Sequence, residues 1–339
     1  MAEMTSGNKT LLDIRDLRIS YKVYGGYAKV INGISLHVDE GEKIGLVGES
    51  GCGKTTTVRS ILRVLPRQAV IQGGKILFDG DSLLELNEKR LNQVRGQKLS
   101  MIFQDPISAL NPVFTVGDQI EDTICYSGLV AGNDKKAIHE RAIQALKDCS
   151  MPDPERILNN YPFQLSGGMR QRICIAMALA TASKLMIADE PTTNLDVTIQ
   201  DQVLRLIRSL SDQKKMSLIL ITHSLGVARL MTDRIYVMYA GNIVETARTS
   251  EIFEKAYHPY TQGLLSSIPK LTGEGMMEGI EGRIPDYRNP PDGCRFCDRC
   301  PHRQERCRRE LPPLYDKGNG HLVACFQYEG EEGKPDDRS

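Results

Sequence analysis

Hydrophobic and polar positions alternate in the first part of the chain, and helical spacing follows. Between residues 11 and 48, stretches such as LLDIRDLRIS and ISLHVDEGEKIGLVG alternate as β-strands separated by turns do. From Lys54 the pattern becomes helical in KTTTVRSILRVL, and GGKILFDG is a further strand bounded by glycines. Residues 110–180 have helical periodicity, which is clearest in KKAIHERAIQALKDC.

Two continuous apolar runs come next, KLMIADE and SLILITH, with the amphipathic stretch VTIQDQVLRLIRSLSDQKK between them. Apolar strands that alternate with amphipathic helices predict an α/β fold with a mainly parallel, buried sheet. From about residue 256, proline, glycine and cysteine become more frequent and the periodicity fades. We therefore expect one domain over residues 1–255, with its helical part at about 110–180, a C-terminal extension over 256–328, and a disordered tail over 329–339.

Composition narrows the class of protein. The chain has 339 residues, of which 40% are hydrophobic and 25% charged, as in soluble globular proteins with more than one core. Lys+Arg and Asp+Glu are both 43, and this balance argues against nucleic acid as the main partner. The longest apolar run, ICIAMALATA, is too short to cross a bilayer, and MAEMTSGNKT lacks a signal-peptide pattern. We expect a cytosolic protein, in which structural disulfides are disfavoured.

A phosphate-binding loop is predicted at residues 48–55. The sequence GESGCGKT fits G-x-x-x-x-G-K-[ST] and lies between a predicted strand and a predicted helix. The glycines allow backbone N–H groups to surround phosphate oxygens, and the helix N-terminus adds a favourable dipole. Lys54 is expected to reach the β- and γ-phosphates, and Thr55 to bind Mg²⁺. The residues expected to bind the nucleotide in this region are Gly48, Ser50, Gly51, Gly53, Lys54, Thr55 and Thr56.

A pair of carboxylates at the end of a buried strand complements this loop. KLMIADE ends at Asp189 and Glu190. Asp189 is expected to hold Mg²⁺ through water, and Glu190 to polarise the attacking water as a general base. Adjacent acidic residues are common on protein surfaces, so the pair alone is weak evidence. Together with the phosphate-binding loop that precedes it, the pair indicates a nucleotide-hydrolysis site.

The stretch LSGGMRQR, residues 165–172, resembles the signature sequence of ATP-binding cassette (ABC) proteins. Ser166, Gly167 and Gly168 are placed to cap a helix that begins near Met169, which leaves N–H donors at a positive helix end. The ABC family also implies three further motifs, and all occur in its order between residues 48 and 223. They are a glutamine after a strand (Gln104), a D-loop (Asn194-Leu195-Asp196) and a switch histidine after the next strand (His223).

The resemblance implies a P-loop NTPase cassette with a RecA-like core and a helical subdomain. Two such cassettes enclose two ATP molecules, and the signature of one meets the γ-phosphate held by the other. Gln104 is then a Mg²⁺ ligand, and His223 lies near the γ-phosphate, with a buried core histidine as the alternative. The adenine stacks on an aromatic residue before the loop, for which Tyr24 has the best spacing, ahead of Tyr27, with Tyr21 also available.

Four further stretches resemble the ATPases of oligopeptide, dipeptide and nickel importers. They are QDPISALNP, EPTTNLDVTIQ (with Asn194 where alanine is more common), HPYTQGLLSSIP and a cysteine pattern near the C-terminus. The resemblance implies an ATP hydrolase that powers peptide import, with nickel complexes or oligosaccharides as alternative cargo. It implies a second ABC ATPase subunit, two transmembrane permease subunits and an extracytoplasmic substrate-binding protein as partners. The chain would be peripheral on the cytoplasmic side of the cell membrane.

Two other classes of function are less consistent with the sequence. A soluble ABC ATPase that acts on ribosomes or DNA usually carries two cassettes or long coiled-coil insertions, and the sequence has neither. A module that binds without hydrolysis would be expected to lack Glu190 or His223, and both are present.

Cysteines concentrate in GCRFCDRCPHRQERC, residues 293–307, and Cys325 follows. The C-x₂-C-x₂-C-P spacing is similar to that of ferredoxins, while tetrahedral zinc also accepts four thiolates at mixed spacings. The family resemblance favours a structural 4Fe–4S cluster over zinc, with Cys297 as a spare thiol. Cys125, Cys149 and Cys174 are expected to be inert core residues. The cluster ligands that the resemblance implies are Cys294, Cys300, Cys307 and Cys325.

Overall fold

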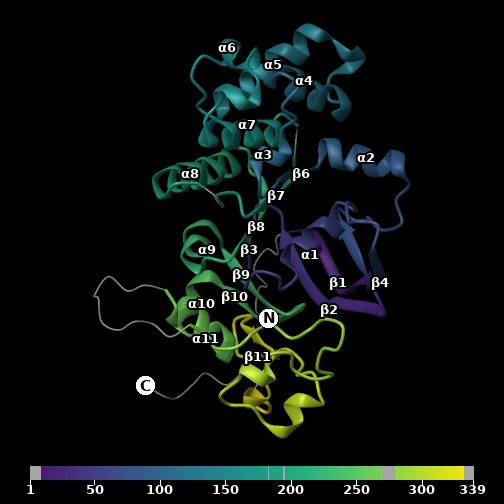
Figure 1. Ribbon diagram of the computed structural model, residues 1–339, viewed down its shortest axis with the longest axis vertical. Helices are drawn as coiled ribbons and strands as arrows, with labels where there is room; N and C mark the ends of the chain where they lie inside the picture. The colour runs from purple at the N-terminus through teal and green to yellow at the C-terminus, as the bar shows by residue number, and fades with distance from the viewer. Residues whose placement is uncertain (1–8, 182, 194, 269–278, 332–339) are drawn as a thin grey trace, which may run out of the picture. The chain divides into compact units, whose positions relative to one another are not determined.

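The computed structural model describes residues 9–181, 183–193, 195–268 and 279–331, without the side chains of Ile107 and Asn133. These residues form two compact units, each assembled from separate segments (Figure 1). The P-loop unit contains residues 10–38, 43–84 and the described residues from 221 onward. The helical unit contains residues 39–42 and 85–220, with Lys9. No helix in the described part of the chain has the length and apolar character needed to cross a membrane.

The P-loop unit contains a four-stranded sheet that the alternation pattern did not reveal. Its strands lie in the order β2-β1-β4-β5, and β4 pairs antiparallel with both β1 and β5, with Leu12 opposite Phe78. Alternation predicts strands but not their partners, so the expectation of a mainly parallel sheet was wrong for this part. The strands are β1 (Thr10–Val23), β2 (Gly26–Asp39), β4 (Ala69–Phe78) and β5 (Asp81–Ser82).

A second sheet in the same unit carries the glycine-rich loop. Its strands lie in the order β11-β12-β10-β9-β3, with β3 and β9 parallel and the other pairs antiparallel. These strands are β3 (Lys43–Val47), β9 (Arg234–Tyr239), β10 (Asn242–Arg248), β11 (Tyr315–Asp316) and β12 (Leu322–Val323). The helices of the unit are α1 (Lys54–Ile61), α9 (Leu225–Met231), α10 (Thr249–Glu254) and α11 (Pro259–Ser266).

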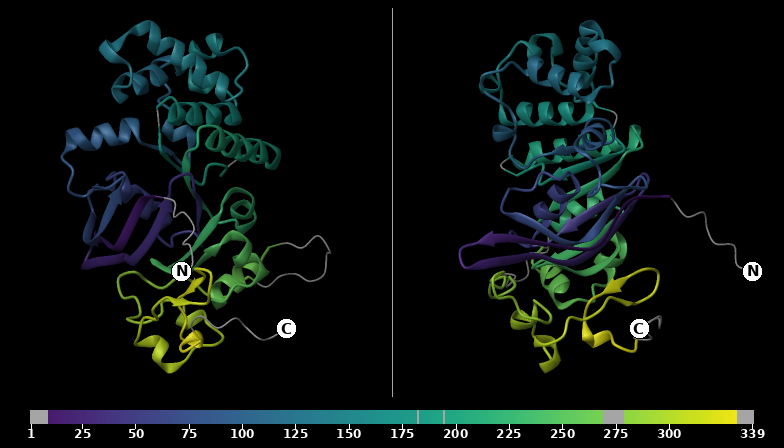
Figure 2. Two further views of the ribbon diagram at one scale, coloured as in Figure 1. Left: turned by 180° about the vertical axis from the view of Figure 1, so that it is seen from behind. Right: turned by 90° about the vertical axis from the view of Figure 1, so that its right-hand side faces the viewer.

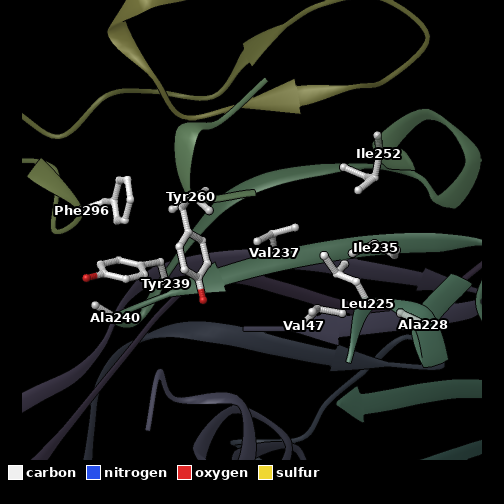
Figure 3. Packing of buried hydrophobic residues seen from close by; sticks show 12 residues of the cluster. Val47, Leu225, Ala228, Ile235, Val237, Tyr239, Ala240, Ile252, Tyr260 and Phe296 are labelled. Carbon is white, nitrogen blue, oxygen red and sulfur yellow. The ribbon is translucent and has the colours of Figure 1, made fainter. Parts of the chain in front are cut away.

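Aromatic side chains from distant parts of the sequence meet in the core of the P-loop unit (Figure 3). Tyr239 from β9 packs edge-on against Tyr260 from α11 and against Phe296, with ring centroids 4.7 and 5.0 Å apart. Phe296 lies between two of the clustered cysteines and is 2% exposed. The cysteine-rich stretch therefore contributes to the same core as the strands around the phosphate-binding loop.

A buried carboxylate organises the other side of this region. Glu245 on β10 is fully buried, and its oxygens accept hydrogen bonds from the backbone N–H groups of Tyr257 and His258 at 2.7 and 3.1 Å. The ring of His321 contacts the same carboxylate at 2.7 Å. Burial lowers the pKa of His258 to about 4 despite the nearby Glu245 carboxylate, so this imidazole is neutral at physiological pH. The three contacts join β10 to segments 12 and 76 residues away in the sequence.

The helical unit contains a small parallel sheet and most of the helices (blue through teal to green in Figure 2). Strands β6 (Leu99–Ile102), β7 (Leu185–Asp189) and β8 (Ser217–Thr222) are neighbours in this order, and the division between the units falls within β8. Helices α4, α5, α6 and α7 lie where helical periodicity was expected, and α4 packs against the other three. The helices are α2 (Glu88–Gln97), α3 (Pro106–Ala109), α4 (Val116–Ser127), α5 (Lys135–Asp148), α6 (Pro154–Leu158), α7 (Gly167–Leu179) and α8 (Val197–Gln213).

The apolar run near Ile173 and two of the three cysteines expected in the core are buried, as predicted. The run that begins at Ile173 forms the buried part of α7. Cys149 and Cys174 are buried, and burial raises the pKa of both thiols to about 12, which keeps them protonated and unreactive. Cys125 is only partly buried, so its assignment to the core was wrong. The predicted domain boundary at residue 255 stays a prediction.

Candidate nucleotide-binding site

The glycine-rich loop connects β3 to α1 with a backbone that requires glycine. Gly51 and Gly53 have φ values of 82° and 110°, a region that residues with a Cβ rarely adopt. A Cβ on Gly53 would lie 2.7 Å from the side chain of Ile31, and one on Gly48 would collide with the carbonyl of Met238. Ile31 and Met238 therefore pack closely against the loop and fix the path of its backbone.

The lysine of this loop is held against the loop backbone. Lys54 is 4% exposed, and its Nζ donates to the carbonyl oxygens of Gly48 and Glu49 at 2.7 and 2.9 Å. Thr55 is half-buried at the start of α1, next to Thr56, while Ser50 is exposed. The residues predicted to bind phosphate thus form one continuous segment, a loop from Gly48 to Gly53 followed by the first residues of α1.

The tyrosines proposed for adenine stacking lie on one hairpin. Tyr24 is fully exposed in the turn between β1 and β2, and Tyr27 is 46% exposed. The hydroxyl of Tyr21 lies 3.1 Å from Oγ1 of Thr56. Tyr21 thus contacts the helix after the loop, whereas Tyr24 presents an open ring, and the choice of Tyr24 stays a prediction.

His223 follows β8 directly and is exposed. Ser224, the next residue, accepts a hydrogen bond from the backbone N–H of Val227 at 3.3 Å and caps α9. The exposed position excludes the alternative of a buried core histidine. Its role beside the γ-phosphate stays a prediction.

In the helical unit, the structure brings Gln104 and Glu190 together. Asp189 ends β7 and is 1% exposed, and Glu190 follows with a φ of 46°, a strained value for a residue with a side chain. Oε2 of Glu190 accepts hydrogen bonds from Nε2 of Gln104 at 3.0 Å and from Oγ1 of Thr193 at 3.1 Å. The turn after β7 therefore holds the carboxylate in one orientation. Asn194 of the proposed D-loop lies outside the described residues.

The signature stretch begins α7 as the sequence suggested, two residues earlier than predicted. Ser166 is the N-cap and accepts a hydrogen bond from the N–H of Met169 at 3.3 Å. A Cβ on Gly168 would lie 3.1 Å from Ile199, whereas Gly167 has more room. Gln171 donates from Nε2 to the carbonyl oxygen of Pro191 at 2.7 Å, which ties α7 to the turn after Glu190.

Gln171 and Thr193 were not among the predicted site residues. Both occur inside recognised motifs, so the motifs pointed to the right segments. Their roles depend on contacts across the turn after β7, which spacing in the sequence does not reveal.

The clustered cysteines line one pocket in the P-loop unit. Its walls include all five thiols of this region together with Phe296, Pro312 and Phe326. Burial, with a smaller contribution from the neighbouring cysteines, raises the pKa of Cys294 to about 12 and that of Cys325 to about 11. The backbone N–H of Cys294 donates to the carbonyl of Cys307 at 2.8 Å. Among the described residues, however, no group of three or more His, Cys, Asp or Glu side chains is arranged as a metal-binding cage.

Two known protein families match this chain, one in its N-terminal part and one in its C-terminal part. The ABC transporter family matches residues 31–193, and the oligopeptide/dipeptide transporter C-terminal region matches residues 244–307. A probable peptide ABC transporter ATP-binding protein of Sinorhizobium fredii, y4tR, is 46% identical over 320 residues, which cover 94% of this chain and 95% of that protein. The chain belongs to the ABC transporter ATP-binding proteins.

Within this family of ABC ATPases, two further similarities agree with the assignment. The oligopeptide transport ATP-binding protein OppD of Bacillus subtilis is 45% identical over 319 residues, which cover 93% of this chain and 88% of OppD. The dimeric, post-hydrolysis structure of the ATP-binding cassette MJ0796 with ADP and Pi is 26% identical, with a TM-score of 0.63, over 70% of this chain and 99% of that one. The chain is an ATP-hydrolysing cassette with the P-loop NTPase fold.

Proposed function

We propose that this ABC ATPase powers the import of oligopeptides or dipeptides across the cytoplasmic membrane. The observation that carries the proposal is the combination, on one chain, of the complete set of cassette motifs with the oligopeptide/dipeptide C-terminal region. Relatives that match more than nine-tenths of the chain are named as peptide, oligopeptide or dipeptide transport ATP-binding proteins.

The residues divide the work of hydrolysis between them. The backbone from Gly48 to Gly53 and the ammonium of Lys54 would bind the phosphates of ATP, while Thr55 and Gln104 would hold Mg²⁺, with Asp189 acting through water. Glu190 accepts a proton from the attacking water, and His223 stabilises charge on the γ-phosphate. The hydrogen bonds from Gln104 and Thr193 to Glu190 support this role, because they orient the carboxylate before the water arrives.

The second half of each site comes from another cassette. Ser166, Gly167 and Gly168 begin α7, whose N-terminus would face the γ-phosphate bound by the partner subunit. ATP binding then closes the pair and hydrolysis reopens it, and the motion is passed to two transmembrane permease subunits. An extracytoplasmic binding protein would deliver the peptide, with this chain peripheral on the cytoplasmic side.

The test is reconstitution of the chain with its permease and binding-protein partners in liposomes. We expect labelled dipeptides or tetrapeptides to accumulate only with ATP and to raise ATP turnover several-fold. The same complex with Glu190→Gln controls for leakage. Transport of nickel complexes or oligosaccharides but not peptides would overturn the cargo assignment, and a complete complex that hydrolyses ATP without accumulating any of these solutes would overturn the transport assignment.

We also propose that Cys294, Cys300, Cys307 and Cys325 hold a 4Fe–4S cluster, with zinc as the alternative. The gathering of these thiols in one pocket supports the proposal, because it brings enough sulfur ligands together to bind a metal centre, whose positive charge would favour the thiolate forms that burial alone disfavours. Such a cluster would cross-link a stretch that contains only short strands and 3₁₀ turns. Cys297 is the spare thiol.

Metal analysis of protein purified without oxygen decides between the alternatives. We expect about four iron and four sulfide per chain with absorption near 400 nm, and the loss of both in Cys307→Ser. Cys297→Ser is the matched control and should retain the iron. One zinc per chain and no colour would establish the alternative, and no metal in the parent protein would contradict both.

A further inference from the structure

An arginine within the cysteine segment, defined as residues 294–307, contacts the phosphate-binding loop. Arg299 lies between Cys297 and Cys300, while Glu49 is the first variable residue of the loop. The Arg299 guanidinium donates to both carboxylate oxygens of Glu49, at 2.9 and 3.1 Å. The Arg299 side chain is 6% exposed and that of Glu49 is 29% exposed. A two-point contact with so little water around it fixes both direction and distance.

The remaining donors of Arg299 anchor it to its own surroundings. Nε donates to the carbonyl of Glu281 at 2.7 Å, Nη2 to that of Ile280 at 2.8 Å, and Nη1 to the hydroxyl of Tyr239 at 3.3 Å. With the two bonds to Glu49, all five N–H donors of the guanidinium are used. The side chain therefore has one well-defined position from which it holds Glu49.

Two tyrosines contact the loop backbone beside this ion pair. The hydroxyl of Tyr260 accepts a hydrogen bond from the N–H of Glu49 at 2.9 Å, and the hydroxyl of Tyr287 donates to the carbonyl of Gly51 at 2.7 Å. Tyr260 also packs against Phe296, a residue of the cysteine segment (Figure 3). The side chains of Tyr260, Tyr287 and Arg299 thus contact the loop on both sides of Ser50.

We propose that Arg299 is a positioning residue for ATP binding, and that the ordered cysteine segment and the ATP-bound loop stabilise each other through the Arg299–Glu49 pair. Arg299 is placed to act on nucleotide through Glu49 and the loop backbone, whose shape determines where the N–H donors point. Since coupling between two sites is reciprocal, ATP must then also stabilise the cysteine segment. The inference rests on the proposed assignment of residues 48–55 to the ATP phosphates.

The first test measures ATP affinity of the full-length, metal-loaded protein with a fluorescent ATP analogue. We expect Arg299→Met to weaken binding about tenfold, since couplings between sites typically change affinity by about 5- to 150-fold. Arg299→Lys should recover part of the loss, because lysine keeps the charge but not the two-point geometry. In steady-state turnover, KM should rise more than kcat falls.

Arg308→Met is the matched control. Arg308 lies in the neighbouring turn of the cysteine-rich region, and its ion pair with Asp298 at 3.1 Å joins side chains that are 61% and 64% exposed. Its replacement should leave ATP affinity unchanged.

If Arg299→Met fails to fold, Glu49→Gln tests the same contact from the side of the loop. In folded protein the effects of the two variants should be less than additive, as expected for partners in one contact.

Hydrogen exchange provides the second readout. ATP should slow exchange at residues 294–300 in the parent and in Arg308→Met but not in Arg299→Met.

The variant Lys54→Ala, titrated with the same fluorescent ATP analogue, tests the assignment of the phosphate-binding loop separately from the positioning role of Arg299. If Lys54→Ala loses ATP binding while Arg299→Met binds as the parent does, the positioning role is overturned and the loop assignment stands. If Lys54→Ala binds ATP like the parent, the loop assignment itself is wrong and the positioning role with it.

Discussion

Replacement of Glu190 by glutamine is expected to lower ATP turnover by about 10²- to 10⁴-fold, the usual contribution of a general base, while ATP binding persists. Glutamine is isosteric and keeps an oxygen that accepts from Gln104 and Thr193, so the turn after β7 should retain its shape. The amide cannot take a proton from water. Because ATP remains bound and uncleaved, the cassette pair should stay closed.

Phosphate release measures the loss of ATP turnover, and size-exclusion chromatography with ATP measures the persistence of the closed dimer. The variant should show almost no release and an ATP-dependent dimer that persists. Asp201→Asn is the control, because Asp201 is an exposed carboxylate on α8 of the same unit that forms a surface ion pair with Arg205. Hydrolysis near the parental rate in Glu190→Gln would remove Glu190 from the role of general base.

Replacement of Glu245 by alanine is expected to lower the free energy of unfolding by about 3–5 kcal/mol, as when one partner of a buried charged network is removed. The substitution leaves the N–H groups of Tyr257 and His258 and the ring of His321 without their acceptor in a region that water does not reach. Glutamine at this position keeps one acceptor oxygen, so the loss should be smaller.

Urea unfolding followed by circular dichroism, together with hydrogen exchange at residues 244–258, measures this effect. Glu305→Ala is the control, since Glu305 pairs with Arg309 in a fully exposed position and its loss should leave stability unchanged. Equal stability of Glu245→Ala and the parent would mean that the three contacts contribute no net stabilisation.

The parts of the fold that the sequence predicted are those governed by local periodicity. The apolar run before Asp189 is β7, and the helical spacing after Lys135 is α5. The capped helix at Ser166 could be predicted because its capping bond links residues three positions apart. The order of the cassette motifs then indicated the fold, since few other architectures place these residues in this succession.

The parts that the sequence did not predict depend on pairing over long distances. Nothing local to β1 shows that it pairs with β4 in a separate antiparallel sheet. The contact between Arg299 and Glu49 joins residues 250 positions apart, and arginines are frequent around the cysteines. Gln104 and Glu190, 86 positions apart, were assigned separate roles, and only the fold shows the bond between them.

The contact between Arg299 and Glu49 of the phosphate-binding loop has a consequence during synthesis. A ribosome that has completed Gly51 must add 248 further residues before Arg299 leaves the peptidyl-transferase centre, which takes about 12–50 s at typical elongation rates of about 5–20 residues per second. Until the end of this interval, the phosphate-binding loop lacks at least one of the side chains of Tyr260, Tyr287 and Arg299 that contact it in the folded protein. The nascent phosphate loop is therefore translated early but completed late, and we expect it to be a substrate for chaperones until the cysteine segment emerges.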